Sequence, residues 1–263
     1  MITSVHNPRV KQAIHLRQHR QRKQSQLTLI DGARELARAI AAGVAVREVF
    51  VCAELCRGGP ARQLLELLAG SPIERIDVSE AVFAKLAFGQ RAEGVVGIAA
   101  VNERGLEDLP LPANPLVAVV EGVEKPGNLG AVLRSADGAG VAALVAADPR
   151  TDLFNPNVIR ASLGTVFSLP VAAAAPGDVL LWLRARRLQI LAARVEGSVS
   201  YTEVDYRQPT AIVLGSEAQG LTALWSGDDV HAIRLPMLGA ADSLNVSATA
   251  AVLFYEALRQ RTK

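Results

Sequence analysis

The sequence predicts an α/β protein in two parts, on three observations. Short apolar runs alternate with amphipathic helical segments along the 263 residues, which is typical of helices that cover a sheet. Half of the residues are hydrophobic but only 4% are aromatic, which favours helix-rich packing over a β-sandwich. The apolar runs of the second part are continuous rather than alternating, which indicates a mostly parallel sheet buried on both faces.

The first part, residues 1–101, is predicted to be a small α/β domain. Residues 27–55 have the pattern of strand, turn, helix and strand, and Gly43 ends a helix whose apolar face includes Leu36. The later elements are a helix at 61–70, a strand at 73–78, a helix at 78–87 and a strand at 94–101. Residues 102–114 combine charged residues with prolines and lack periodicity, so we expect a linker there.

The second part, residues 115–263, is predicted to be a separate α/β domain. Ligands of such sheets tend to bind at the carboxyl ends of strands, and the polar motifs of this part follow strands. The predicted strands are 116–120, 141–147, 188–193, 210–215 and 230–235.

The first of these strands is followed by a glycine-rich turn at Gly127, Asn128 and Gly130. A helix is expected over 129–139, and Arg134 lies on it. Such a strand-to-helix turn can hold an anion on free N–H groups, or it can be an ordinary connection.

The fourth strand is followed by GSEAQGLT, residues 215–222. Leu221 stands where a P-loop has its lysine, so an NTP-binding P-loop is excluded. The sequence also lacks G-x-G-x-x-G, H-E-x-x-H and G-x-S-x-G. What remains is Glu217 between Gly215 and Gly220, for which a structural and a catalytic role are both open.

The fifth strand is followed by LPMLGAADSLNVS, residues 235–247, which precedes a helix expected from Ala248 onward. Polar side chains crowd here although one cap suffices for a helix. We expect Ser243 to cap the helix and also to face a site, with Asn245 beside it.

The net charge of +2 conceals a basic segment, because residues 1–30 contain no acid. Such a segment fits contact with a phosphate backbone, and the alternative is a solvated helix face. Its cations are Arg9, Lys11, Arg17, Arg20, Arg22 and Lys23.

The two cysteines, Cys52 and Cys56, form a lone C-x-x-x-C, which is a weak zinc signal beside the alternative of two buried or free thiols. We therefore expect no metal. No apolar run has the length of a membrane span, and no signal peptide is evident, so a cytoplasmic protein is expected.

Three motifs, PGNLGAVLRSADGAG, IVLGSEAQGL and LPMLGAADSLNVSATAAVLFYEAL, resemble in order those of the SpoU/TrmH branch of the SPOUT RNA methyltransferases. NPNVIRASLGTVFSLPV, residues 155–171, resembles the family's segment between the first two motifs. LTLIDGARELARAI resembles, more weakly, the small ribosomal-protein-like substrate-binding domain of the ribosomal-RNA members, with Asp31 where the family often has Glu.

The resemblance implies methylation of a ribose 2′-hydroxyl in RNA by S-adenosylmethionine, with ribosomal RNA of the large subunit favoured. It also implies a trefoil knot in the second domain and a homodimer. The implied catalytic residues are Asn128, Arg134, Glu217, Ser243 and Asn245. The implied cofactor-binding residues are Leu214, Gly215, Gly220, Leu235, Pro236, Met237, Ser243 and Leu244.

Two further residues, Arg160 and Ser162, join the basic segment as candidates for RNA contact. Arg134 is expected to stabilise the developing alkoxide or to fix the adjacent phosphate, because a guanidinium stays protonated and is a poor base. A tRNA 2′-O-methyltransferase and a non-catalytic RNA-binding or ribosome-assembly protein remain as alternatives.

Overall fold

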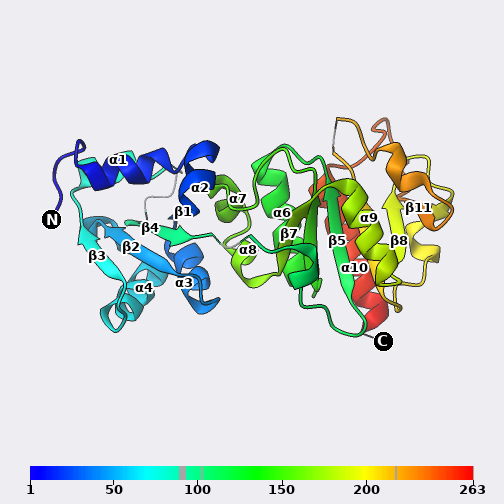
Figure 1. Ribbon diagram of the computed structural model, residues 1–263, viewed down its shortest axis with the longest axis horizontal. Helices are drawn as coiled ribbons and strands as arrows, with labels where there is room; N and C mark the ends of the chain where they lie inside the picture. The colour runs from blue at the N-terminus through cyan, green and yellow to red at the C-terminus, as the bar shows by residue number, and fades with distance from the viewer. Residues whose placement is uncertain (89–92, 102, 217, 263) are drawn as a thin grey trace. The chain divides into compact units, whose positions relative to one another are not determined.

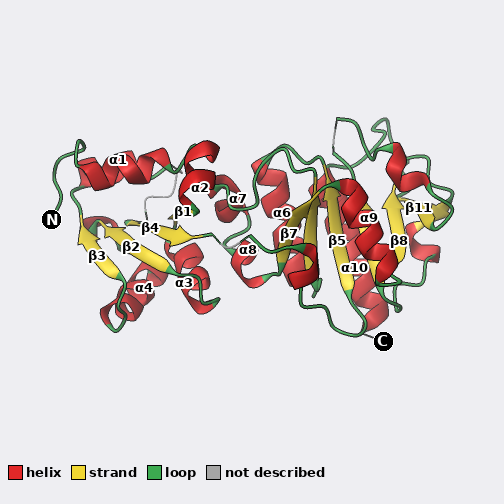
Figure 2. Cartoon of the chain, viewed as in Figure 1, coloured by secondary structure: helices red, strands yellow, loops and turns green. Residues whose placement is uncertain are grey.

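The computed structural model describes residues 1–88, 93–101, 103–216 and 218–262. The chain divides into two compact units. The N-terminal unit comprises Met1–Asn102 and Phe154–Ser168, and the C-terminal unit comprises Glu103–Leu153 and Leu169–Lys263. Figure 1 follows the chain through both units, and Figure 2 distinguishes their helices and strands.

The N-terminal unit is built on a mixed sheet of four strands within the described residues. The β4 strand pairs antiparallel with both β1 and β2, whereas β2 and β3 are parallel, so the expected α/β domain is confirmed as a mixed one. In spatial order the strands are β1 (Leu27–Asp31), β4 (Val95–Ala100), β2 (Val46–Val51) and β3 (Glu74–Asp77).

The basic segment of this unit is helical. Asn7 caps the first helix by accepting a hydrogen bond from the N–H of Arg9, and Pro8 is its first residue, where a missing N–H costs nothing. The helices are α1 (Pro8–His15), α2 (His19–Ser25), α3 (Ala33–Ala41), α4 (Gly59–Ala69) and α5 (Glu80–Leu86). Val10 and Ala13 of α1 are buried in the core of the unit.

The segment Phe154–Ser168 completes the N-terminal unit although the C-terminal unit flanks it in sequence. It carries α7 (Pro156–Ala161) and α8 (Thr165–Ser168). Its carbonyls accept hydrogen bonds from this unit, since Thr28 Oγ1 lies 2.7 Å from the oxygen of Phe154 and Arg38 Nη1 lies 2.6 Å from that of Leu163. The segment is therefore an integral part of this unit.

The C-terminal unit is built on a sheet of seven strands within the described residues, and all of the strand pairs described are parallel. In spatial order they are β7 (Val171–Ala174), β6 (Ala143–Ala147), β5 (Leu116–Glu121), β10 (Thr210–Leu214), β8 (Gln189–Ala193), β11 (Val230–Arg234) and β9 (Val199–Ser200). Every residue of β5, β6 and β10 is buried, which confirms a sheet covered on both faces.

Three long helices cover this sheet. The helix α9 (Pro176–Ala185) packs its Val179 and Leu183 with the apolar strand residues of one face. The helices α6 (Pro126–Gly138) and α10 (Val246–Arg261) pack against each other, and Figure 1 shows α10 and α9 on opposite faces of the sheet. The trefoil knot stays a prediction.

The connections contain short 3-10 turns. The expected linker includes one of them, so it is not wholly irregular. The turns are η1 (Ala53–Leu55), η2 (Leu106–Asp108), η3 (Tyr201–Glu203) and η4 (Ala223–Ser226). No helix in the described part of the chain is both long and apolar enough to cross a membrane.

Candidate active site

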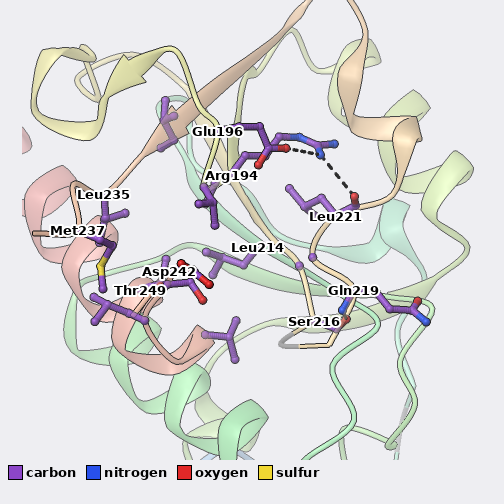
Figure 3. Close-up of a pocket in the computed structure, with 18 residues that line it drawn as sticks. Arg194, Glu196, Leu214, Ser216, Gln219, Leu221, Leu235, Met237, Asp242 and Thr249 are labelled. Carbon is purple, nitrogen blue, oxygen red and sulfur yellow. Dashed lines mark hydrogen bonds and ion pairs between the residues drawn. The ribbon is translucent and has the colours of Figure 1, made fainter. Parts of the chain in front are cut away.

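A cavity of about 350 Å³ opens at the carboxyl ends of three adjacent parallel strands, β10, β8 and β11. Leu214 enters it from β10, Ala193 from β8 and Ile233 from β11, and Gly215 directly follows β10. The remaining wall comes from the residues that follow β8 and β10, from the segment before α10 and from its first turn (Figure 3). Carboxyl strand ends are where open α/β sheets bind ligands, so this cavity is the candidate active site.

The turn after β10 requires a glycine because two backbone segments meet there. A Cβ on Gly215 would lie 2.2 Å from the carbonyl carbon of Gly220, which is too close for any side chain. The turn is closed by Ser216, whose carbonyl accepts from the N–H of Gly220 at 2.9 Å and whose Oγ accepts from that of Gln219 at 3.2 Å. Gly220 itself has a φ of +63°. The turn thus forms a close-packed wall of the cavity.

The predicted cofactor-binding residues gather at this cavity. All of them except Pro236 are among the described residues that line it, and Pro236 is exposed between two lining residues. The lining members are Leu214, Gly215, Gly220, Leu235, Met237, Ser243 and Leu244. Residues from the second and the third sequence motif therefore meet in one place.

The start of α10 differs from the expectation in one respect. Asn245 is the N-cap, and its Oδ1 accepts from the N–H of Ser247 at 2.9 Å. The prediction that Ser243 caps this helix is wrong, because Ser243 lies two residues before the cap and lines the cavity instead. The Asn245 Nδ2 also lies 3.4 Å from Asn128 Oδ1, which brings the starts of α10 and α6 together.

Arg134 lies on α6 as predicted, and its side chain is exposed. It makes no hydrogen bond or ion pair with the residues that the structure describes. Neither Arg134 nor Asn128 is among the described residues that line the cavity. Glu217 lies outside the described residues.

Three arginines of the basic segment are occupied within the N-terminal unit. Arg9 pairs with Glu48 and, at 2.6 Å, with Glu74, and the hydrogen bonds that its guanidinium donates to Glu74 and Glu48 raise its pKa. Arg17 Nη2 donates to the carbonyl of Lys85 at 2.6 Å.

Arg22 is buried, and its Nη1 donates to the carbonyls of Leu16 and Arg17, both at 2.8 Å. This burial argues against the phosphate contact that the sequence predicts for it. The exposed cations of the segment whose side chains make neither a hydrogen bond nor an ion pair within the described residues are Lys11, Arg20 and Lys23.

The other two RNA-contact candidates, Arg160 and Ser162, are also engaged. Arg160 Nη1 forms an ion pair with the buried Asp31 at 3.1 Å, which ties α7 to the end of β1. Ser162 is fully buried and donates to the carbonyl of Ile159 at 2.9 Å. The structure supports a structural role for both residues.

The two cysteines are buried free thiols, and burial raises the pKa of Cys52 to about 11. Thiols with a raised pKa are protonated and are poor metal ligands. No group of three or more His, Cys, Asp or Glu side chains placed to hold a metal ion occurs in the described ranges.

The sequence reasoning missed the contribution of β8. Arg194 and Glu196 follow this strand and line the cavity, as do Asp242 and Thr249 near the start of α10 (Figure 3). The sequence did contain a signal for these residues, because the strand at 188–193 was predicted. Ligands bind at the carboxyl ends of parallel strands, so the residues after this strand were candidates for the site as well.

Comparison with known proteins extends over both units. Residues 115–255 match the model of the SpoU rRNA Methylase family, and residues 7–97 match that of the MRM3-like substrate binding domain. The 23S rRNA (uridine(2479)-2′-O)-methyltransferase of Streptomyces viridochromogenes is 31% identical over 242 residues, which is 89% of this chain and 83% of that protein.

Two solved structures match almost the entire chain. A crystal structure of an RNA 2′-O ribose methyltransferase has a TM-score of 0.88 and 41% identity, covering 100% of this chain and 99% of that one. The SpoU methyltransferase AviRb from Streptomyces viridochromogenes, in complex with AdoMet, has a TM-score of 0.87 and 29% identity, covering 98% of this chain and 99% of that one.

Proposed function

Because the chain belongs to the SpoU rRNA methylase family, we propose that it transfers the methyl group of S-adenosylmethionine to a ribose 2′-hydroxyl of 23S-type ribosomal RNA. The observation that carries this proposal is the meeting of the second and third motifs at one cavity. Leu214 ends β10, Leu235 follows β11 and Ser243 precedes α10, yet all three line the same cavity.

The cavity fits this cofactor in size and in chemistry. Its volume of about 350 Å³ is in the range of small-molecule sites. Leucines such as Leu214 and Leu235 offer apolar walls for a purine, and Gln219 and Ser243 offer hydrogen-bonding groups. The carboxylates of Glu196 and Asp242 suit a ligand that carries an ammonium and a sulfonium. When bound, S-adenosylmethionine supplies an activated methyl group.

The chain's own residues would control the position and charge of the RNA hydroxyl. Arg134 is exposed and has no ion pair within the described part of the chain, so its guanidinium can reach an incoming phosphate or alkoxide. A planar fork of donors binds such oxygens well and stabilises charge that develops in the transition state. Asn128 and Asn245 hold the starts of α6 and α10 together, and Ser243 stands at the cavity edge.

RNA recognition is assigned to the N-terminal unit. Its match to a substrate-binding domain and the three exposed cations Lys11, Arg20 and Lys23 support this assignment. Their contacts with phosphate would add affinity that falls with salt. The presence of this domain favours ribosomal RNA over tRNA.

A homodimer and a cytoplasmic location complete the proposal. Val252 and Tyr255 lie one turn apart on α10 and are 36% and 50% exposed, which leaves apolar surface for a second copy. The free thiols of Cys52 and Cys56 agree with a reducing compartment, where ribosomal RNA is also found.

The test is methyl incorporation from labelled S-adenosylmethionine into separated, unmodified ribosomal RNA and tRNA. Label in ribosomal RNA that is lost with Arg134→Ala is the expected result. Label in tRNA alone would overturn the choice of substrate. Binding of S-adenosylmethionine without transfer to either RNA would favour a non-catalytic RNA-binding protein.

A further inference from the structure

Residues 220–226, which follow the turn after β10, form a loop that we call the pocket loop. Gly220 and Leu221 line the cavity, and the loop ends in the 3-10 turn η4. Its next residue, Thr222, is exposed, yet its polar groups are engaged from two sides by side chains of opposite charge.

The negative side is Glu121, the last residue of β5. It is only 4% exposed, and both of its carboxylate oxygens accept from one residue. Oε2 accepts from the N–H of Thr222 at 2.8 Å, and Oε1 accepts from its hydroxyl at 2.9 Å. A buried carboxylate needs such donors, because an unpaired one is expensive to desolvate.

The positive side is Arg194, the first residue after β8. Its Nη2 donates to the carbonyl of Thr222 at 2.9 Å, to the carbonyl of Trp225 at 3.3 Å and to Oγ of Ser226 at 3.1 Å. Glu196 lies 3.7 Å from Nη1 on its outer side. A guanidinium spans several acceptors at once because its donors are spread over a planar fork, which a lysine ammonium lacks.

From this geometry we infer that Glu121 and Arg194 are positioning residues that clamp Thr222 and so hold the pocket loop as a preformed wall of the cofactor cavity. The two side chains come from the carboxyl ends of two strands that both neighbour β10 in the sheet. The loop is therefore fixed to strands on either side of the one from which it emerges. A preformed wall strengthens ligand binding, because a mobile loop would lose conformational entropy when the ligand binds. The identity of the ligand as S-adenosylmethionine rests on the proposed function.

The chain contains a natural reporter of this clamp. Trp225 lies in the pocket loop, is 1% exposed and accepts from Arg194 through its carbonyl. The only other tryptophan is Trp182 on α9. A Trp182→Phe background therefore makes Trp225 the sole source of tryptophan fluorescence, which reads the loop without any cofactor.

The experiment adds Arg194→Met to that background. Acrylamide quenching of Trp225 is expected to rise by roughly twofold or more, because an unclamped loop opens locally. The Kd for S-adenosylmethionine, measured by calorimetry, is expected to rise by roughly tenfold, while kcat at saturating cofactor changes by less than about threefold. Thr222→Val, which deletes only the hydroxyl donor to Glu121, is expected to act in the same direction and more weakly.

The matched control is Arg184→Met. Arg184 also pairs with a carboxylate of this unit, Asp229 at 2.7 Å, but the pair is exposed and neither residue is among the described ones that line the cavity. No change in quenching or Kd is expected, since exposed pairs contribute little.

Unchanged quenching in both Arg194→Met and Thr222→Val would overturn the clamp. Increased quenching with an unchanged Kd would overturn its link to the cofactor cavity. Failure of the parent protein to bind S-adenosylmethionine would overturn the proposed function and the ligand named here, whereas the quenching result would still decide whether Arg194 holds the loop.

Discussion

The structure brings the predicted cofactor-binding residues together at one cavity, whereas it engages several of the predicted RNA-binding cations within their own unit. Around the cavity, the predicted residues Gly215, Leu235 and Ser243 meet in one place. In the basic segment, Arg9 and Arg22 are held by partners inside their own unit. The positions of residues in backbone turns can therefore be predicted from sequence more reliably than the partners of a run of charged side chains.

The physical reason lies in the length of the side chains. A glycine turn or a strand end places its own backbone groups, so its position in the sheet is enough to locate them. An arginine reaches far from its backbone, and its partners are distant in sequence, as Glu48 and Glu74 are from Arg9. A count of positive charge cannot show which cations remain available.

The largest effect is expected at Arg134 of the C-terminal unit. Arg134→Ala is expected to slow methyl transfer by about 10²–10³-fold, because one preorganised donor to developing charge contributes roughly 2.7–4 kcal/mol. Arg134→Lys should also be badly impaired, since it keeps the charge but loses the planar fork. Single-turnover methylation of unmodified RNA measures both, and near-normal turnover of Arg134→Lys would contradict the fork.

The next effect tests whether the cavity depends on backbone contact. Gly215→Ala places a Cβ 2.2 Å from the Gly220 backbone, so the turn must shift. Such overpacking costs about 1–3 kcal/mol, and we expect the Kd for S-adenosylmethionine to rise by roughly tenfold. Calorimetry measures it. Gly177→Ala is the control, because nothing lies within 4 Å of a Cβ there.

A smaller effect is expected in the basic segment, where three exposed cations remain available. Replacing Lys11, Arg20 and Lys23 by alanine together should lower RNA affinity and reduce the salt slope by about 2–3, because each lost phosphate contact removes ~0.7–0.9. Filter binding over a range of salt concentrations measures the slope. An unchanged slope would show that the segment does not touch RNA.

Arg22→Ala provides the matched contrast. It should leave the salt slope unchanged but lower the free energy of unfolding by about 1–3 kcal/mol, because the buried carbonyls of Leu16 and Arg17 lose a donor. A reduced salt slope in this variant would mean that the guanidinium leaves its buried position to bind RNA.

The smallest effect is a pH dependence. The hydrogen bond from Arg9 lowers the pKa of Glu74 below 4.5. The ionised pair therefore stabilises the fold above pH 4.5, and this contribution is lost as the pH falls through the lowered pKa. Glu74→Gln should melt slightly below the parent at pH 6, and the two melting temperatures should converge once the pH is below the lowered pKa. A difference that is constant with pH would contradict the pair.

Most of the fold could be predicted because its elements are encoded locally. The strand expected at 210–215 is observed at Thr210–Leu214, and the helix expected at 61–70 is observed at Gly59–Ala69. Strand β7 was missed, because VAAA is too short and too rich in alanine to differ from a helix or a loop. The capping role was given to Ser243 rather than Asn245 because both residue types cap equally well.

The candidate site could be predicted only in part. Gly215 and Ser243 belong to short motifs that are visible in the sequence. The Glu121–Thr222–Arg194 arrangement instead joins residues far apart in the chain, since Thr222 lies 101 positions after Glu121 and 28 after Arg194. Pairing of that range depends on the order of strands in the sheet, and a single sequence does not state that order. Arg134 could be placed on its helix, but its exposure was not visible in the pattern.

The membership of Phe154–Ser168 in the N-terminal unit has a consequence for the timing of synthesis. When Asn102 has been translated, the partner carbonyls of Thr28 and Arg38 do not yet exist. At 5–20 residues per second, the ribosome needs roughly 3–13 s more to reach Ser168. During that interval the nascent N-terminal unit is incomplete, because the segment Phe154–Ser168 has not yet been synthesised.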